Sequence, residues 1–377
     1  MTVISEPRLA GAVRTAERVL SSRAGVQVDL TDPVDLGGSG RTDVVRVRVA
    51  PNPVTMDRTL VIKVWPADEQ GDAFARELAS YKYATALPTP SRPGPHLIAF
   101  DHRARVIVLS DLGHGRSMAE LLAATDTDAA HRAVSAWGQA LGRMHAATVG
   151  GEQDFAALLR HGPDRSTAES LAVHLDAGVA LAPEVLADDL GVGAAPEFVA
   201  VLRRGAGLVR EGDHRAFSPS DVGPPNILLN DAGVQFMDYE WGGFRDATLD
   251  IAYACLTCTS ALAPSLDAHR DDLVTAMIDA WRSEVQSIWP SLGHDGEMNR
   301  KMLVARTLWV WMSTLWMLPV DLGDDSHARG LALRTGDPTV VVGRWRDLAD
   351  AARRAGVAEV ADCSAAIAEA LDAAWLR

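Results

Sequence analysis

Two aspartates and an asparagine near the middle of the chain have the types and spacing that phosphoryl transfer requires. Asp221 and Asn226 lie five residues apart and bracket Gly223–Pro225, a stretch that cannot be helical. A rigid loop of this kind can aim a carboxylate at an acceptor hydroxyl while the asparagine oxygen holds Mg²⁺. Asp238 follows a hairpin signal at 230–233. The hairpin would return Asp238 to the side of Asn226, so that two hard oxygen donors meet, as Mg²⁺ requires.

Four motifs around these residues occur in a fixed order. They are Pro219-Ser220-Asp221, Asn226-Ile227-Leu228, Met237-Asp238-Tyr239-Glu240 and Asp250-Ile251-Ala252. Together they resemble the catalytic loop of the aminoglycoside phosphotransferase and choline kinase superfamily, which are small-molecule kinases with a protein-kinase-like fold. The family pattern has His-Gly before the aspartate, where this chain has Pro219-Ser220. Because that histidine is scaffolding in the family, the departure concerns the geometry of the loop more than its chemistry.

The resemblance implies a role for each polar residue of the loop. Asp221 is expected to accept or orient the proton of the acceptor hydroxyl, and Asn226 and Asp238 to hold Mg²⁺ against the phosphates of ATP. Glu240 is expected either to reach a second metal ion through water or to hold the loop. Asp250 is expected to buttress the loop by accepting backbone N–H bonds.

The fold implied by the resemblance is α+β, with two lobes. An N-lobe (1–111) holds a five-stranded antiparallel sheet and a helix, a hinge lies at about 109–113, and a larger, mainly helical C-lobe (112–377) carries the catalytic loop and the substrate-binding helices. Local patterns in the sequence predict strands at 26–30, 44–49, 59–65, 97–100 and 105–109, and helices at 6–23 and 70–85. Further helices are expected at 117–124 and 130–148, within an insertion at 151–216, and near 249–262, 267–288, 297–318, 340–355 and 359–375.

A glycine-rich hairpin is expected between the first two strands. Backbone N–H groups at Gly38, Ser39 and Gly40 could approach phosphates there without side-chain clash. The segment is not a Walker A loop, because no Gly-Lys-Ser/Thr follows and no helix begins. An ordinary glycine-rich turn would look similar.

Lys63 is a lone lysine in an apolar strand pattern. In the kinase-like arrangement such a lysine reaches the α- and β-phosphates and is held by a glutamate of the next helix, here Glu77. A solvent-facing strand lysine and an exposed helix glutamate are the alternatives. Downstream, Ser110, Asp111 and Leu112 resemble the hinge whose backbone groups hydrogen-bond the adenine edge.

Several conspicuous residues are expected to be structural. His145 lies on the buried stripe of its helix, and Cys255 and Cys258 lie in an apolar helical stretch with no second cysteine pair. The tryptophans Trp309, Trp311 and Trp316 are expected in the core, with a sugar-stacking platform as the alternative.

The composition and net charge of the chain limit the functions that it could have. The formal net charge of −14 argues against nucleic-acid binding and is compatible with a cationic small substrate. No apolar run is long enough to span a membrane, and charged residues interrupt the first 25 positions where a signal peptide would need an apolar core. Three cysteines in 377 residues favour a reducing, cytoplasmic setting without a disulfide framework. We expect a monomer or homodimer.

The sequence does not identify the molecule that accepts the phosphate. An aminoglycoside-like antibiotic, an amino sugar, a sugar and an amino alcohol such as choline all remain candidates, and so does a nucleotide-binding pseudokinase that acts through a partner. Acidic residues could face an aminated substrate, although exposed helix-end carboxylates are commoner; these are Asp271, Asp272, Asp321, Asp324 and Asp325.

Overall fold

The computed structural model of the chain describes residues 6–37, 42–51, 58–66, 73–161, 170–319 and 331–376. Gly38, Ser39 and Gly40 of the expected phosphate loop lie outside these ranges, as do Asp321, Asp324 and Asp325. No helix in the described part is long and apolar enough to cross a membrane.

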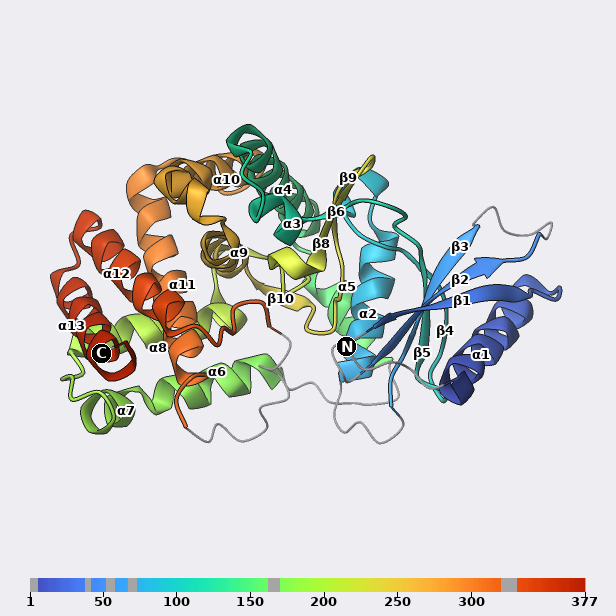
Figure 1. Cartoon of the computed structure of the whole chain (residues 1–377), viewed down its shortest axis with the longest axis horizontal. Helices are drawn as coiled ribbons and strands as arrows, with labels where there is room; N and C mark the ends of the chain where they lie inside the picture. Colours follow the sequence, from blue (N-terminus) through green and yellow to red (C-terminus); the bar gives the residue numbers. More distant parts are fainter. Residues whose placement is uncertain are drawn as a thin grey trace.

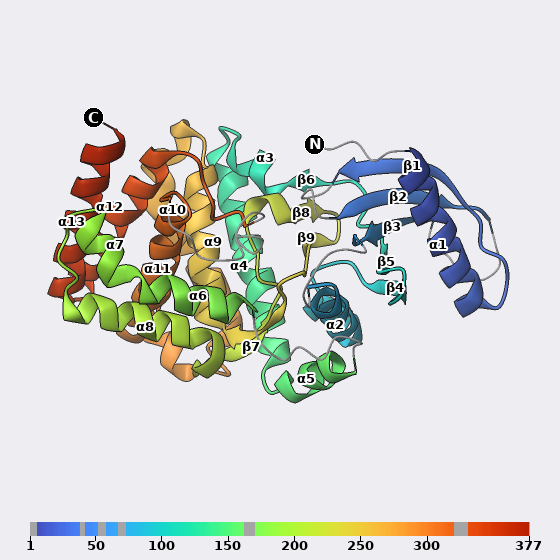
Figure 2. The same ribbon diagram turned by 90° about the horizontal axis from the view of Figure 1, so that it is seen from below.

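A five-stranded antiparallel sheet forms one end of the molecule (Figure 1). Its strands are β1 (Leu30–Gly37), β2 (Asp43–Val49), β3 (Thr59–Val64), β4 (Leu97–Asp101) and β5 (Val106–Ser110), in the spatial order β1-β2-β3-β5-β4. Helix α1 (Glu6–Ala24) packs on one face, and α2 (Ala73–Ala86) lies on the side toward the rest of the molecule (Figures 1 and 2). Successive side chains of β3 point to opposite faces of the sheet, so both faces can be covered by a helix. Leu60 and Ile62 point to the α1 side and Lys63 to the other.

The first strand differs from its predicted position. Residues 26–30 were expected to form it, but β1 begins at Leu30 and runs through a polar, largely exposed stretch to Gly37. The reason lies in the end of α1: Ser21 Oγ accepts from the Val28 N–H at 2.9 Å, and Glu17 Oε1 accepts from the Leu30 N–H at 2.9 Å. Helix side chains therefore take the backbone donors that a sheet partner would need.

The larger part of the molecule is mainly helical. Its long helices are α4 (Thr127–Thr148), α8 (Pro196–Glu211), α9 (Ala247–Ala261), α10 (Arg270–Val285), α11 (Asp295–Leu315), α12 (Pro338–Arg354) and α13 (Ala358–Trp375). Shorter ones are α3 (Met118–Leu122), α5 (Glu152–Arg160), α6 (Ser170–Ala180) and α7 (Ala182–Asp188), with 3₁₀ turns η1 (Thr89–Ser91), η2 (Pro224–Asn226), η3 (Pro264–His269) and η4 (Pro290–Gly293). A five-stranded antiparallel sheet with a helix, followed by a larger helical part, confirms the predicted fold class.

Two small sheets inside the helical part hold the loop that was singled out in the sequence. One pairs β7 (Arg215–Ser218) with β10 (Gly243–Asp246), and the other has the order β6-β8-β9. Its members are β6 (Arg116–Ser117), β8 (Ile227–Asn230) and β9 (Gly233–Phe236), the last two joined by the predicted hairpin. The loop between β7 and β8 is thus fixed at both ends by strand pairing.

Two hydrophobic clusters of buried side chains build the core. The smaller lies between α1 and the outer face of the sheet and includes Leu20, Val47 and Ile62. The larger runs without a break from α2 and the inner face of the sheet into the helices, joining Phe74 to Trp281. The inner face of the sheet therefore shares its core with the helical part.

The residues predicted to be structural are buried. Trp309 Nε1 donates to the Leu249 carbonyl at 2.9 Å and Trp311 Nε1 to the Gly178 carbonyl at 2.8 Å, which confirms both as core residues. Trp316 is buried as well. All three cysteines are free, buried thiols.

Candidate active site

Strand pairing brings the two expected metal-binding residues together. The Met237 N–H donates to the Asn226 carbonyl at 2.8 Å, continuing the β8–β9 ladder, so Asp238 follows directly beside Asn226. Both side chains line a cleft of about 560 Å³ between the five-stranded sheet and the helical part. Asp238 adopts a left-handed backbone conformation with φ +62°, rare for a non-glycine residue, so its placement is held at a cost in strain.

The Asp221 carboxylate is buried and surrounded by donors. Tyr253 Oη donates to its Oδ1 at 2.6 Å, and Asn226 Nδ2 donates to its Oδ2 at 2.9 Å. The backbone N–H of Ala332 also donates to Oδ2, at 3.1 Å. Burial raises the pKa of Asp221 to about 6, while the hydrogen bonds from Tyr253 and Ala332 pull in the opposite direction. Asp221 is therefore a carboxylate whose pKa lies close to neutrality.

Lys63 lies between two carboxylates. Its Nζ donates to Glu77 Oε1 at 2.6 Å and to Asp238 Oδ1 at 2.5 Å. The other glutamate oxygen accepts from Trp65 Nε1 at 2.6 Å, which fixes the orientation of the Glu77 carboxylate. Burial alone lowers the pKa of Lys63, but attraction to Asp238 and Glu77 outweighs it and holds the pKa well above its usual value. The side chain is thus a positioned cation on the floor of the cleft.

A buried hydrogen-bond chain supports the loop from below. Trp281 Nε1 can only donate, so His145 Nδ1 accepts at 2.9 Å and the ring proton lies on Nε2, which donates to Asp250 Oδ2 at 3.1 Å. Ser218 Oγ donates to Asp250 Oδ1 at 2.7 Å and accepts from the Ser220 N–H at 2.9 Å. Asp250 thus steadies the loop through the Ser218 hydroxyl, where direct backbone donors were expected.

Ser220 explains how the loop accommodates its departure from the family pattern. It lies at φ +82°, in the left-handed region that favours glycine, at the position where the family pattern has glycine. Its hydroxyl accepts from Arg245 Nη1 at 3.0 Å, and the same guanidinium donates through Nη2 to the Trp241 carbonyl at 2.6 Å. A fully buried arginine therefore holds the strained residue in place.

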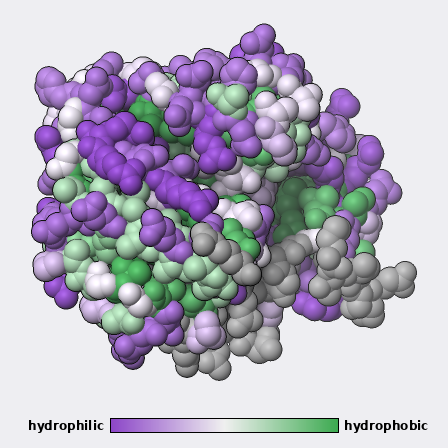
Figure 3. Space-filling view, turned by 60° about the vertical axis from the view of Figure 1, so that its left-hand side comes forward, coloured by the Kyte–Doolittle hydropathy of each residue, from purple (hydrophilic) through white to green (hydrophobic). Residues whose placement is uncertain are grey.

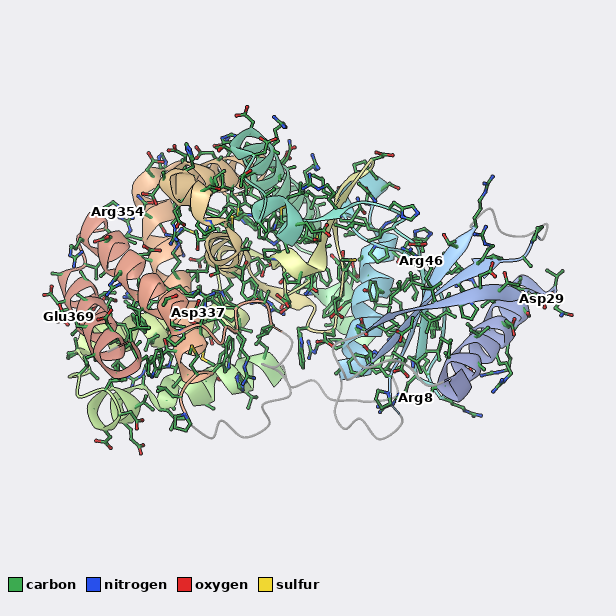
Figure 4. The ribbon with its side chains drawn as sticks, in the orientation of Figure 1. Arg8, Asp29, Arg46, Asp337, Arg354 and Glu369 are labelled. Atoms are coloured by element: carbon green, nitrogen blue, oxygen red, sulfur yellow. The ribbon has the colours of Figure 1, made fainter. Side chains whose placement is uncertain are left out.

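The hinge residues and the flanks of the glycine-rich hairpin also line the cleft. Ser110, Asp111 and Leu112 are among its lining residues, and so are Gly37 and Thr42. The Asp111 carboxylate is paired with Arg46 (labelled in Figure 4), whose Nε lies 2.9 Å from Oδ2. This pair ties β2 to the hinge across the cleft.

Two of the predicted catalytic and metal-binding residues, Asp221 and Glu240, do not line the cleft, although Asp221 is hydrogen-bonded to Asn226, which does. Glu240 is buried and its carboxylate accepts from Trp241 Nε1 at 2.9 Å, whereas Asn226, Asp238 and Lys63 line the cleft. Of the two roles expected for Glu240, this placement favours holding the loop. Asp271 and Asp272 are exposed in the first turn of α10, as carboxylates at helix starts commonly are.

Two contacts of the Asp221 carboxylate were missed in the sequence. Tyr253 lies three residues after Asp250 on α9, and its large buried side chain with a hydroxyl one helical turn from that aspartate was a usable signal. Ala332 contributes only its backbone N–H, and no side-chain pattern could have indicated it.

The donors at the cleft suit Mg²⁺. Asn226 turns its amide nitrogen toward Asp221, which leaves its oxygen for a metal ion, and Asp238 supplies a carboxylate. Within the described ranges no group of three His, Cys, Asp or Glu side chains could form a complete protein cage. A site with two protein oxygens fits Mg²⁺, which usually keeps waters and takes its other ligands from substrate phosphates.

Comparison with known proteins gives structural matches alone. No protein-family model matches the chain, and no curated protein sequence matches it. A choline/ethanolamine kinase family protein from Mesorhizobium loti has a TM-score of 0.47 at 16% identity, covering 90% of this chain and 93% of that one. APH(2″)-IIa, solved with gentamicin, has a TM-score of 0.49 at 10% identity and covers 92% and 97%.

A third match is the amicoumacin kinase hAmiN, solved with AMP-PNP, Ca²⁺ and its ligand. Its TM-score is 0.46 at 11% identity, and the alignment covers 78% of this chain and 84% of that one. With identities below 25% and TM-scores below 0.5, none of these matches assigns a function, which must come from the side chains of the site.

Proposed function

We propose that the protein is a phosphotransferase that moves the γ-phosphate of ATP to a hydroxyl of a small molecule, with Mg²⁺ as the metal. The observation that carries this proposal is that Asn226 contacts the candidate base and also lines the candidate nucleotide site. Asp221 and Asn226 share a hydrogen bond of 2.9 Å, and the same Asn226 lines the cleft with Asp238 and Lys63. A base at Asp221 would therefore adjoin the metal ligand Asn226, which shares the cleft with the phosphate-binding cation Lys63, and phosphoryl transfer uses these three groups together.

Each residue then has a distinct task. Asp221 orients the acceptor hydroxyl and takes its proton, for which a pKa near neutrality is suited. Lys63, held by Glu77, binds the α- and β-phosphates. Asn226 and Asp238 hold Mg²⁺, which when bound neutralises charge on the phosphates. Catalysis in this arrangement is mainly positioning and charge neutralisation.

The same proposal divides the chain into a nucleotide-binding lobe, 1–111, and a catalytic lobe, 112–377. The adenine ring would lie against the hinge near Asp111 and Leu112, and Gly38, Ser39 and Gly40 would cover the phosphates. Support comes from the cleft, whose lining residues include Gly37 and Thr42 as well as those of the hinge.

The acceptor class is proposed more broadly. An aminoglycoside-like antibiotic, an amino sugar or a sugar fits a hydroxyl acceptor, and a choline-like amino alcohol is the alternative. No described contact identifies the group bound beside Asp221. A pseudokinase is less favoured, because the lysine, the glutamate, the base and both metal ligands are all present.

The test is an ADP-release screen with Mg·ATP against aminoglycosides, amino sugars, sugars and choline-like alcohols, with the Asp221→Asn variant as control. We expect at least one acceptor to stimulate ADP release by the wild type and not by the variant. Nucleotide binding without turnover on any acceptor would favour the pseudokinase, and no Mg·ATP binding at all would refute both.

A further inference from the structure

A second polar cavity lies in the helical part, apart from the nucleotide cleft. Its volume is about 110 Å³, and α9, α10, α11 and α12 form its walls. Four arginines line it: Arg270, Arg306, Arg344 and Arg354. Three aspartates, Asp271, Asp347 and Asp350, also line it. The face on the side of α12 and α13 carries a band of strongly hydrophilic side chains (Figure 3), and Arg354 is labelled in Figure 4.

The ion pairs around this cavity leave an excess of positive charge. Arg270 Nη1 lies 3.3 Å from Asp347 Oδ2, and Asp350 is paired with Arg353, which is not part of the lining. Among the described residues, no carboxylate lies within ion-pair distance of Arg306, Arg344 or Arg354. The lining thus has one more arginine than it has aspartates, and Asp347, which is paired with Arg270, is also attracted to Arg306. This local excess is notable in a chain of net charge −14.

Arg344 is the deepest of these cations. It is 3% exposed, and its Nη1 and Nη2 donate at 2.9 Å to two neutral acceptors, the Leu333 carbonyl and the Ser260 hydroxyl. Its Nε and the Nε of Arg306 are buried and have no hydrogen-bond partner in the described part of the chain. Burial lowers the pKa of Arg344 to about 10, which reflects a cation without a compensating anion. Buried charge of this kind is costly unless an anion offsets it.

We propose that this cavity binds a small tetrahedral oxyanion, inorganic phosphate or sulfate, between Arg306, Arg344 and Arg354. The unsatisfied N–H donors of two arginines and the net positive lining match such an ion, because guanidinium groups bind phosphate oxygens through charge-assisted hydrogen bonds. The volume suits an inorganic ion and excludes a nucleotide. Leu256, Val274 and Val310 add apolar lining beside the arginines.

The cavity also has a direct connection to the carboxylate of the proposed active site. Arg344 donates to the Leu333 carbonyl, the Leu333 N–H donates to Tyr253 Oη at 3.0 Å, and that hydroxyl donates to Asp221. An ion bound to Arg344 would therefore contact the side chain that holds the Leu333 carbonyl in place. The binding proposal itself does not depend on the kinase proposal.

The experiment is a calorimetric titration of the full chain with inorganic phosphate, without nucleotide or Mg²⁺ and at constant ionic strength. A Lys63→Ala background removes phosphate binding in the nucleotide cleft. Arg306→Gln is the test variant, since Arg306 anchors no backbone group in the described residues, whereas Arg344→Gln would also release Leu333. Arg346→Gln is the matched control, because Arg346 is an exposed α12 arginine paired with Asp372 outside the cavity.

We expect saturable phosphate binding in the Lys63→Ala background. Adding Arg306→Gln should weaken this binding at least about tenfold, a loss of about 1.4 kcal/mol. Adding Arg346→Gln should leave the affinity unchanged. Circular dichroism melting without phosphate checks that each variant is folded. Equal affinity in Arg306→Gln and its background, or no saturable binding in the millimolar range, would overturn the proposal. Loss of binding through Lys63→Ala alone would place the phosphate in the nucleotide cleft and overturn it as well.

Discussion

The candidate active site contains two buried ionic centres that are built in opposite ways. Lys63 is compensated by two carboxylates, one on α2 and one beside the catalytic loop. Asp221 has no cation within ion-pair distance among the described residues, and its donors are a hydroxyl, an amide and backbone N–H groups. The first arrangement keeps a charge permanently in place, whereas the second leaves a carboxylate that can take up a proton near neutral pH. Under the proposed function, the contrast would separate phosphate binding at Lys63 from proton transfer at Asp221.

The largest effect should come from removing the uncompensated charge. Asp221→Asn preserves the shape of the side chain and leaves the Lys63 centre intact, so Mg·ATP affinity should stay within a fewfold of the wild type. Turnover should fall by about 10² or more, the usual scale for losing a positioned acid–base group. Single-turnover ADP release, measured with any acceptor found in the screen, checks this. A variant within a fewfold of wild-type turnover would contradict the role of Asp221.

Asp238→Ala should act on binding instead. Asn226 is a neutral ligand and cannot hold a hard dication well by itself. We expect Mg²⁺-dependent ATP affinity to fall by about tenfold or more, equivalent to about 1.4 kcal/mol, in isothermal titration. The control is the affinity for ATP measured with EDTA present, which should differ little between the wild type and Asp238→Ala. Unchanged binding of Mg·ATP would mean that the metal lies elsewhere.

Lys63→Ala removes the cation from the compensated centre and leaves Glu77 buried without its partner. ATP affinity and turnover should fall together, because the contact with the phosphates is made in the ground state. The free energy of unfolding should also fall, by about 3 kcal/mol, the scale for breaking a buried ion pair. Urea denaturation, compared with Lys63→Ala combined with Glu77→Gln, tests the second effect. The double variant should recover part of the lost stability.

Tyr253→Phe should raise the pKa of Asp221 and also leave the buried N–H of Leu333 without its acceptor. The hydroxyl hydrogen bond lowers the pKa of Asp221, so its removal should raise that pKa above its present value of about 6. Because catalysis requires the unprotonated carboxylate, the acidic limb of the kcat/KM profile should shift to higher pH. Turnover well above that limb should stay within a fewfold of the wild type. A profile that falls at all pH values without shifting would indicate a purely structural tyrosine.

The smallest effect concerns the glycine-like backbone of Ser220. Ser220→Ala and Ser220→Gly both lose the hydrogen bond from Arg245, but only glycine relieves the strain at φ +82°. The glycine variant should therefore be the more stable of the two by about 1 kcal/mol. Equal melting temperatures for this matched pair would show that the loop relaxes around alanine.

The sequence predicted correctly those features that residues close together in the chain determine. The spacing from Asp221 to Asp238, with its hairpin, was sufficient to place Asn226 and Asp238 side by side, because turn chemistry and strand register are local. It failed at β1, where side chains of the preceding helix bind the backbone N–H groups of the expected strand. It also missed Ala332, which lies 111 residues from Asp221 and acts through its backbone alone. Such contacts depend on tertiary packing, and no residue type encodes them.

The continuous core beneath the sheet limits how the molecule could be dissected. Phe74 on α2 and Leu109 next to the hinge belong to the same buried cluster as the long helices, while only the α1 side of the sheet has a core of its own. A fragment that stopped near residue 111 would leave the apolar face of α2 exposed to water and prone to aggregate. The two lobes of this protein therefore share one buried core, although a cleft lies between them.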